Sequence, residues 1–345
     1  MRLRIGIDLM GGDNPPEFLF SAILESAKKL SSSQSLLVLA SKDIVEKISY
    51  FLSSTLSTEI CARISFLECE DIISMTDNPL SAVRQKKKSS LVVGMGLLKR
   101  KKIDAFVSCG NTGAIITAAA IFLNLLPGIT HPALLANLPT EKGTVAVLDV
   151  GGSVLKKAQQ LVRFAFLGAA FQKTVQGIEK PVIGLLNIGM EVGKGTLEIR
   201  QAYEFLNTYS REPIGSATVP SMIFAGNIEA RDLYKGSIDV LVTDGFTGNV
   251  LLKTAEGVAS FIFNALQEKV NLETVVTNSF ENAFNGLKKQ FDYAGYPGAI
   301  VCGIDNVVIK VHGNATADSL GPSIFSAIEY VEKQVISHMK DSCEF

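Results

Sequence analysis

The feature that most constrains the fold of this chain is an alternation of short apolar segments with longer segments of helical periodicity. Leu3–Leu9, Leu36–Ala40 and Ala105–Ser108 are short and apolar, as buried strands are, and helix-like segments follow them. Strands that alternate with helices form a parallel sheet, because each helix returns the chain to the edge where the next strand starts. The 345 residues are therefore expected to form one α/β domain, residues 1–345, around a parallel sheet.

One stretch, Asp239–Gly257, has the parts of an anion site. Its apolar segment ends at Asp244, a polar turn occupies Asp244–Asn249, and apolar residues recur at helical spacing from Val250. In open α/β sheets ligands bind where strands end, and the free N–H groups of a helix N-terminus attract anions. Lys253 lies one turn into this helix. We expect it to contact a phosphate group; a solvated position on the helix is the alternative.

Charge, cysteine and histidine content exclude several classes of function. The 33 basic and 34 acidic residues give a net charge of −1, so no overall field favours nucleic acid. The five cysteines are odd in number without C-x-x-C spacing, and the three histidines are far apart, so neither a disulfide framework nor a metal site is expected. Gly94-Met95-Gly96 lies inside a helical pattern rather than after a strand, so no dinucleotide cofactor is expected.

Three segments bear on location. Met1–Gly12 lacks the long apolar region of a secretory signal, which favours a cytoplasmic protein. The longest apolar run, Ala114–Leu126, is too short to span a bilayer core of ~30 Å. A helical hairpin is expected over residues 258–291, with Phe280 and Phe284 on one face. That face could contact a membrane, a second copy of the chain or the protein core.

Seven blocks occur in order over nearly the whole chain. They are Asp8–Pro16, Ala82–Ser90, Ser108–Ala114, Leu185–Gly195, Phe224–Asp232, Asp244–Gly257 and Ile309–Asn314. Together they resemble the bacterial acyl-(acyl carrier protein):phosphate acyltransferase family, often called PlsX. The resemblance implies a three-layer α/β/α, Rossmann-like fold similar to that of phosphate acetyltransferases and isopropylmalate dehydrogenases, and a homodimer.

The resemblance also implies an activity and partners. Members of the family move a fatty acyl group from the thioester of acyl carrier protein to inorganic phosphate, without a cofactor. The acyl phosphate would then feed a glycerol-3-phosphate acyltransferase, with peripheral contact at the inner face of the membrane. The carrier is acidic in this family, so its docking patch should be basic. Arg84–Lys88, otherwise a solvated helical face, and Lys288–Lys289 are the candidates.

The chemistry needs donors and cations more than a strong acid, because a thiol with a pKa of about 8.5 leaves readily. The protein must hold phosphate against the thioester and stabilise an oxyanion. The catalytic candidates are Lys194, Lys253, His312 and Asn249, with a structural role for His312 equally open. The substrate-binding candidates, expected to share one crevice, are Gly11, Gly12, Asp13, Gly110, Asn111, Thr112, Gly113, Asn187, Glu191, Asn227, Arg231, Asp244, Gly248 and Lys310.

Three other functions stay open at this point. One is a coenzyme A-dependent phosphate acyltransferase of the same fold. A nicotinamide-dependent decarboxylating dehydrogenase is disfavoured because the dinucleotide fingerprint is missing. The third is a non-catalytic, membrane-associated scaffold for lipid synthesis, which would depend on the 258–291 hairpin.

Overall fold

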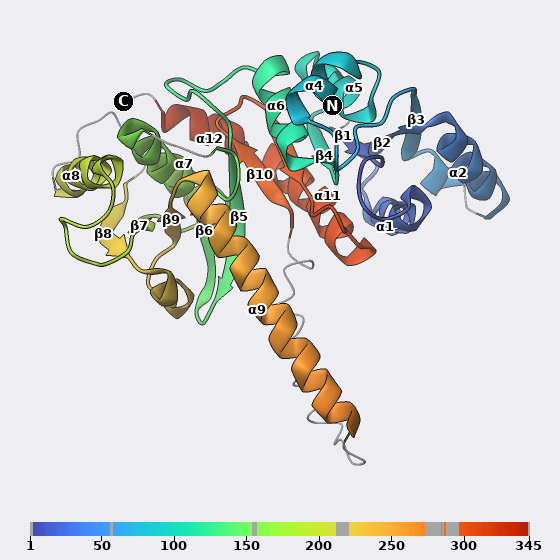
Figure 1. Ribbon diagram of the computed structural model, residues 1–345. Helices are drawn as coiled ribbons and strands as arrows, with labels where there is room; N and C mark the ends of the chain where they lie inside the picture. The colour runs from blue at the N-terminus through green and yellow to red at the C-terminus, as the bar shows by residue number, and fades with distance from the viewer. Residues whose placement is uncertain are drawn as a thin grey trace.

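The chain folds around one sheet with helices on both faces (Figure 1). The computed structural model describes residues 3–55, 58–153, 157–211, 221–272, 284, 286–287 and 297–343. The strands are β1 Leu3–Asp8, β2 Gln34–Ser41, β3 Ile64–Cys69, β4 Ala105–Ser108, β5 Ala133–Thr140, β6 Gly143–Leu148, β7 Val182–Leu186, β8 Ile223–Ile228, β9 Val240–Val242, β10 Ala299–Cys302 and β11 Val307–Lys310. The helices are α1 Pro16–Lys29, α2 Lys42–Thr55, α3 Thr58–Cys61, α4 Pro79–Gln85, α5 Ser90–Lys99, α6 Thr112–Phe122, α7 Ala158–Gln176, α8 Leu197–Arg211, the 3-10 helix η1 Ala230–Lys235, α9 Gly245–Leu272, α11 Ala317–Glu332 and α12 Val335–Asp341.

The described strands form two parallel blocks that run in opposite directions within one eleven-stranded sheet. Its order is β3-β2-β1-β4-β11-β10-β5-β6-β9-β7-β8. The first five strands are mutually parallel, and so are the last four. β10 and β5 join the blocks through antiparallel pairing. The sheet is therefore mixed rather than parallel throughout, because short turns join β5 to β6 and β10 to β11, and short turns connect only antiparallel neighbours.

Two apolar cores, one on each face of the sheet, produce three layers. Alternate residues of a strand point to opposite faces, so Ala146 and Leu148 of β6 belong to one core and Val145 and Val147 to the other. Helices α1, α7 and α11 cover the first core, and α5, α6 and the start of α9 cover the second. The α/β/α fold expected from the sequence is thereby confirmed.

The strands that join the two blocks were not expected from the sequence. The pattern of Ala133–Thr140 predicts no strand, yet these residues form β5. The Gly and Pro residues of Tyr293–Ile304 predict a loop, but its residues 299–302 form β10, and residues 293–296 lie outside the described part. Pro139 lies within β5. Proline is unusual inside a strand, so local pattern alone argued against one there.

Three predicted helices have different limits. The pattern of Pro79–Arg100 predicts one largely helical segment, but it forms two helices, because Ser89 pairs with Asp71 in an isolated bridge and its side chain caps α5. The pattern of Ser319–Met339 likewise predicts one helix, but the segment divides at Gln334, which has a left-handed φ of 54°. Helix α9 begins at Gly245, so most of the predicted turn Asp244–Asn249 is its first turn.

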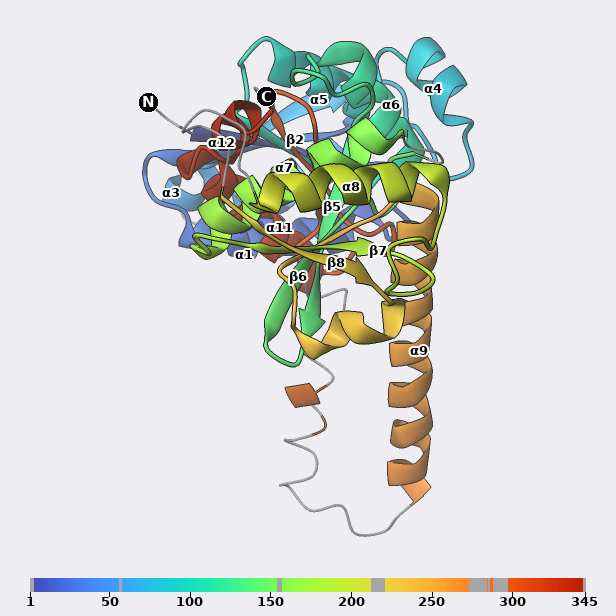
Figure 2. The same ribbon diagram turned by 90° about the vertical axis from the view of Figure 1, so that its left-hand side faces the viewer.

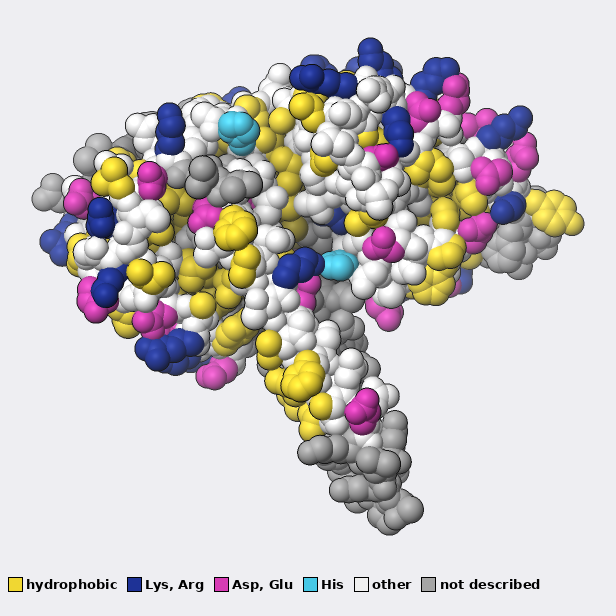
Figure 3. Space-filling model, in the orientation of Figure 1, with side chains coloured by type: hydrophobic (Ala, Val, Ile, Leu, Met, Phe, Trp, Pro, Cys, Tyr) yellow, Lys and Arg dark blue, Asp and Glu magenta, His cyan; other side chains and the backbone are white. Residues whose placement is uncertain are grey.

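Helix α9 projects beyond the body of the molecule in both views (Figures 1 and 2). Hydrophobic side chains gather along its described part, among them the exposed Val258, Phe261 and Ile262 (Figure 3). The ring of Phe284 lies 5.8 Å from that of Phe263, centroid to centroid. The predicted partner Phe280 lies outside the described residues. Among the described helices, none combines the length and apolarity that crossing a membrane requires.

Candidate active site

A crevice where the two blocks meet brings together five of the predicted site residues. Thr112 begins α6, Lys310 and His312 lie at the end of β11, and Asn249 and Lys253 belong to α9. α9 follows the second block of the sheet, whereas α6 and β11 belong to the first. The remaining walls are largely aliphatic and come from β5, the loop after β6, α9 and the segment that leads into β10. They include Leu134, Ala136, Leu138, Val150, Leu252, Pro297 and Ala299.

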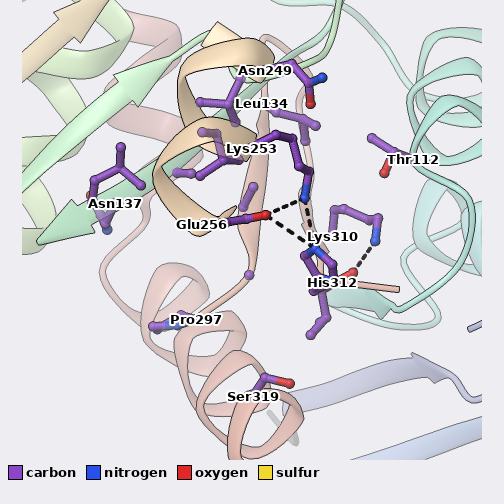
Figure 4. A pocket seen from close by; sticks show the side chains of 17 residues that line it. Thr112, Leu134, Asn137, Asn249, Lys253, Glu256, Pro297, Lys310, His312 and Ser319 are labelled. Carbon is purple, nitrogen blue, oxygen red and sulfur yellow. Dashed lines mark hydrogen bonds and ion pairs between the residues drawn. The ribbon is translucent and has the colours of Figure 1, made fainter. Parts of the chain in front are cut away.

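Three polar side chains converge at the mouth of this crevice (Figure 4). Lys253 Nζ lies 2.9 Å from His312 Nε2 and 2.7 Å from Glu256 Oε2. Glu256 Oε2 lies 3.7 Å from the same histidine nitrogen. Partial burial opposes ionisation of Glu256, but its interactions with His312 and Lys253 outweigh it and lower the pKa of the carboxyl below its ordinary value. The lysine is thus held by a carboxylate on its own helix and an imidazole from the other block.

Lys310 is a buried cation beside this group. Only 8% of the residue is exposed, and its Nζ donates to the carbonyl of Val311. Burial, with repulsion from Lys253, lowers the pKa of Lys310 to about 8, although Asp13 and Asp8 act in the opposite direction. A buried ammonium needs an anionic partner to be stable, and here the nearest carboxylates only partly supply one.

The buried carboxylate of Asp8 lies at the end of β1, in the first block of the sheet. Asp8 Oδ2 accepts a hydrogen bond of 2.7 Å from Ser108 Oγ, and its Oδ1 accepts one of 3.0 Å from the N–H of Met10. Burial raises the pKa of Asp8 to about 6, although these bonds, a further one from Ser90 and the charge of Lys310 lower it. Asp8 therefore fixes the turns that follow β1 and β4.

The glycine turns after β1 and β4 fix the crevice edge through backbone contacts. Gly11 has φ +80°, and a Cβ there would lie 2.6 Å from the carbonyl of Ile73. Gly12 packs against Cys109, and the N–H of Asp13 donates to Gly313 O at 2.8 Å. The turn after β1 is thereby tied to the turn after β11, which carries His312.

Asn111, predicted as a donor to substrate, makes several hydrogen bonds within the fold. Its Oδ1 caps α6 by accepting from the N–H of Ala114, and its Nδ2 donates to the carbonyls of Met75 and Asp77. Gly110 donates its N–H to Ser108 Oγ, and a Cβ at Gly113 would lie 2.7 Å from the ring of Pro79. These residues shape the crevice edge, and Thr112 alone among them lines it.

The predicted residues after β7 and β8 form a separate cluster. Asn187 Nδ2 donates to the carbonyl of Lys194, and Asn227 Nδ2 donates to that of Glu191. The side chains of Lys194 and Glu191 are exposed. None of these residues lines the Lys253 crevice. The structure therefore divides the single crevice expected from the sequence, because β7 and β8 form the far edge of the sheet, whereas the crevice lies where the two blocks meet.

Three further candidates have structural contacts. Asp244 caps α9, its Oδ1 accepting from the N–H of Thr247 at 2.9 Å. Gly248 lies against the end of β6, where a Cβ would be 1.9 Å from the carbonyl oxygen of Asp149. Arg231 forms an ion pair of 2.6 Å with Glu229 and borders the apolar groove along α9. None of the three faces the crevice.

Two acidic residues that contact or border the crevice, Glu256 and Asp149, were not among the site residues predicted from the sequence. Glu256 lies three residues after Lys253, a spacing that places both on one side of a helix, so the pair was detectable. Asp149 is fully buried, and its Oδ1 accepts from the N–H groups of Leu134, Gly151 and Gly152 at 3.0, 3.0 and 2.6 Å. It joins β5 to the loop after β6, and no local pattern signals that contact.

The arrangement suits an anion beside an apolar group. Lys253, Lys310 and Thr112 surround one space in Figure 4, and the aliphatic wall adjoins it. Ammonium and hydroxyl groups can donate hydrogen bonds to an anion bound there. Over the residues with described positions, no group of three or more His, Cys, Asp or Glu is placed to hold a metal ion.

Comparison with known proteins identifies the family to which the chain is similar. Residues 3–338 match a family model described as "Fatty acid synthesis protein". The chain is 38% identical over 345 residues to the phosphate acyltransferase of Chlamydia pneumoniae, covering 98% of this chain and 100% of that one. It is 36% identical over 346 residues to the phosphate acyltransferase of Brevibacillus brevis, covering 99% and 98%.

Solved structures agree at the level of the fold. A phosphotransacetylase from Streptococcus pyogenes superimposes with a TM-score of 0.60 at 14% identity, over 97% of this chain and 94% of that one. EutD phosphotransacetylase from Staphylococcus aureus gives 0.57 at 13%, over 96% and 94%. The full-length sequence match, supported by this fold, shows that the chain belongs to the PlsX family of phosphate acyltransferases, enzymes of fatty acid and phospholipid synthesis.

Proposed function

We propose that this chain transfers a fatty acyl group from the thioester of acyl carrier protein to inorganic phosphate, and that phosphate binds between Lys253 and Lys310. The observation that carries the site assignment is the approach of two ammonium groups from opposite blocks of the sheet. Their mutual repulsion contributes to the lowered pKa of Lys310. A phosphate dianion between them would replace that repulsion by two attractions.

The reaction needs no covalent enzyme intermediate. A phosphate oxygen attacks the thioester carbonyl carbon, the carbon–sulfur bond breaks, and the thiolate leaves with the electron pair and takes a proton from water. Lys253 and Lys310 hold the nucleophile in place. The side chains of Thr112 and Asn249 line the crevice without a hydrogen-bond partner in the described part of the chain. They are free to donate to phosphate or to the developing oxyanion.

The aliphatic wall of the crevice is the proposed binding surface for the acyl group. Leu134, Ala136 and Leu138 are alternate residues of β5, so all three point to the same face of the sheet. They meet Leu252 of α9 next to the cations. An acyl chain lying on this wall would place its thioester carbonyl beside the bound phosphate, and each buried methylene would contribute about 0.8 kcal/mol to binding.

The function is tested by release of the carrier thiol. We expect purified protein to release thiol from acyl carrier protein thioesters only when phosphate is present, with acyl phosphate formed in equal amount. Acyl-coenzyme A serves as the comparison donor, and faster release from it would favour the coenzyme A-dependent rival. An absence of phosphate-dependent release with every acyl chain length and both donors would contradict catalysis and leave the scaffold alternative.

A basic cluster beside the crevice is the proposed contact for the acidic carrier. Lys86 and Lys88 form ion pairs with Asp77 and Glu70 at 2.5 and 2.6 Å. Arg84 and Lys87 are exposed, with no ion-pair partner over the described ranges. The carbonyl of Asp77 accepts from Asn111 at the crevice edge, so the cluster lies close to the mouth. The other candidate, Lys288–Lys289, lies outside the described residues.

We also infer that a second copy of the chain covers the apolar face of α9. That face borders a groove formed with η1 and lined by Tyr234, Leu251, Val258, Ile262 and Leu266. An exposed apolar surface of this kind marks an interface. Replacing Ile262 with Glu should convert a dimer to a monomer in light scattering coupled to size exclusion. A wild-type monomer that sediments with anionic vesicles would instead assign the face to a membrane.

A further inference from the structure

Glu256 is a polar group in the crevice for which the sequence assigned no role. We propose that it is a positioning residue that holds the Lys253 ammonium in the orientation that binds phosphate. The inference rests on the proposed function, because it concerns the phosphate site of that reaction. Its evidence is the convergence of three side chains from two elements that are distant in sequence.

The contact between Lys253 and Glu256 differs in its geometry from an ordinary ion pair on a helix surface. Lys253 and Glu256 are three residues apart on α9, a common spacing, but Lys253 Nζ also lies 2.9 Å from His312 Nε2 on the other block of the sheet. The side chain of Glu256 is 21% exposed, against 49% for Lys253. The carboxylate is therefore the more deeply buried partner, and the ammonium is the more accessible one.

Burial explains why the carboxylate holds the lysine firmly. A partly buried carboxylate loses hydration and is stable as an anion only while donors replace that hydration. Lys253 is the donor in contact with it, at 2.7 Å, and against the effect of burial this contact, together with the interaction with His312 at 3.7 Å, lowers the pKa of Glu256. Releasing Lys253 would leave the carboxylate underpaired, so the lysine is restrained to one region of its rotamer space.

Charge excludes a direct contact between Glu256 and the nucleophile. A carboxylate would repel a phosphate dianion placed against it. The ammonium of Lys253 has three donors, of which one points to Glu256 and one to His312. The third donor is available to phosphate. Glu256 thus acts through Lys253, and restraining a long side chain in advance reduces the entropy lost when the anion binds.

The first test compares Glu256→Gln with wild type. Glutamine keeps the shape and helix propensity but removes the charge. We expect the KM for phosphate to rise about tenfold, and the KM for the acyl donor to stay within about twofold, because only the lysine that contacts phosphate is released. Glu256→Asp keeps the charge one methylene further away and should fall between the two. Equal phosphate KM values for Glu256→Gln and wild type would overturn the proposal.

A matched control separates this effect from loss of any lysine–glutamate pair. Glu329 forms an ion pair of 2.7 Å with Lys333 at the end of α11, away from the crevice. Glu329→Gln therefore breaks a pair of the same length without touching the site, and the phosphate KM should not change. A rise in the control as large as that in Glu256→Gln would show that a general structural effect is responsible, against the proposal.

A double-mutant cycle tests whether Glu256 acts through Lys253. If it does, Glu256→Gln should add almost nothing in a Lys253→Ala background, whereas an independent role would multiply the two effects. Where turnover is too slow, phosphate affinity can be read from the rise in Tm that phosphate produces in each variant. Wild-type protein without phosphate-dependent thiol release would contradict the proposed function. Normal wild-type release with multiplicative effects would contradict only the role of Glu256.

Discussion

Replacing Lys310 with methionine is expected to raise the KM for phosphate about 100-fold at pH 7, because a buried charge in direct contact with a dianion contributes about 2–5 kcal/mol. Methionine fills a similar volume with an unbranched side chain, so the variant should leave no large cavity. Initial-rate kinetics at varied phosphate measure the effect. A phosphate KM within about threefold of wild type would remove Lys310 from the anion site.

The pH dependence of phosphate kcat/KM is a second test of the role of Lys310. The pKa of Lys310 is lowered from 10.5 to about 8, chiefly by burial. The ammonium is therefore lost as the pH rises through about 8, and phosphate kcat/KM should fall there in wild type. In Lys310→Met this fall should be absent, because the titrating group is gone. A fall of equal size in the variant would mean that another group controls it.

Stability provides the control for this variant. The folded chain favours the neutral amine of Lys310, so the stability that this preference contributes is present above about pH 10.5 and is lost as the pH falls through about 8. At about pH 7 the buried ammonium is thus unfavourable to folding, and methionine removes that cost. The Tm of Lys310→Met at that pH should be no lower than that of wild type. A weaker use of phosphate would then not result from unfolding.

Local patterns predicted the layers of the fold but not the arrangement of its sheet. Strands such as β4, with four buried residues, carry their signal in their own composition. The direction of a strand depends on its partner, which lies far away in sequence. β5 pairs with β10 through Leu135 and Ile300, which nearly half the chain separates. The reversal between the two blocks therefore could not be derived from periodicity.

The order of the strands explains which of the predicted site residues are neighbours. Lys253 and His312 were both identified from strand-end turns, and the structure places their nitrogens 2.9 Å apart. Lys194 and Asn227 were identified by the same reasoning, but they follow β7 and β8 at the edge of the sheet and line no part of the Lys253 crevice. A strand-end turn indicates a potential ligand site, and only the topology shows which turns share one. Their role in catalysis stays a prediction.

Several residues predicted to contact substrate make contacts within the fold that position the site. Asn111 uses both ends of its amide within the fold, and Asp244 caps α9. Glycine and capping residues are common to anion sites and to tight packing, so residue type alone cannot distinguish the two. For Gly248 the distinction can be measured, because it lies on the same helix as Lys253.

Replacing Gly248 with alanine is expected to destabilise the protein by about 2–3 kcal/mol or more, the range for inserting atoms into a packed contact. The added Cβ would lie 1.9 Å from the carbonyl oxygen of Asp149 and 2.8 Å from Thr243 Cγ2. The obstructing atom is backbone, which cannot rotate away, so α9 must shift from the end of β6. Thermal or denaturant unfolding measures the loss.

Gly257 offers a matched control on the same helix. A Cβ at Gly257 meets nothing within 4 Å in the described chain, and alanine is favoured over glycine in a helix by about 1 kcal/mol. Gly257→Ala should therefore leave stability unchanged or raise it. Because a shift of α9 also displaces Lys253 from His312, Gly248→Ala should impair phosphate use in the fraction that stays folded, whereas Gly257→Ala should not. Equal stability and kinetics in the two variants would show that the contact with Asp149 does not fix the position of α9.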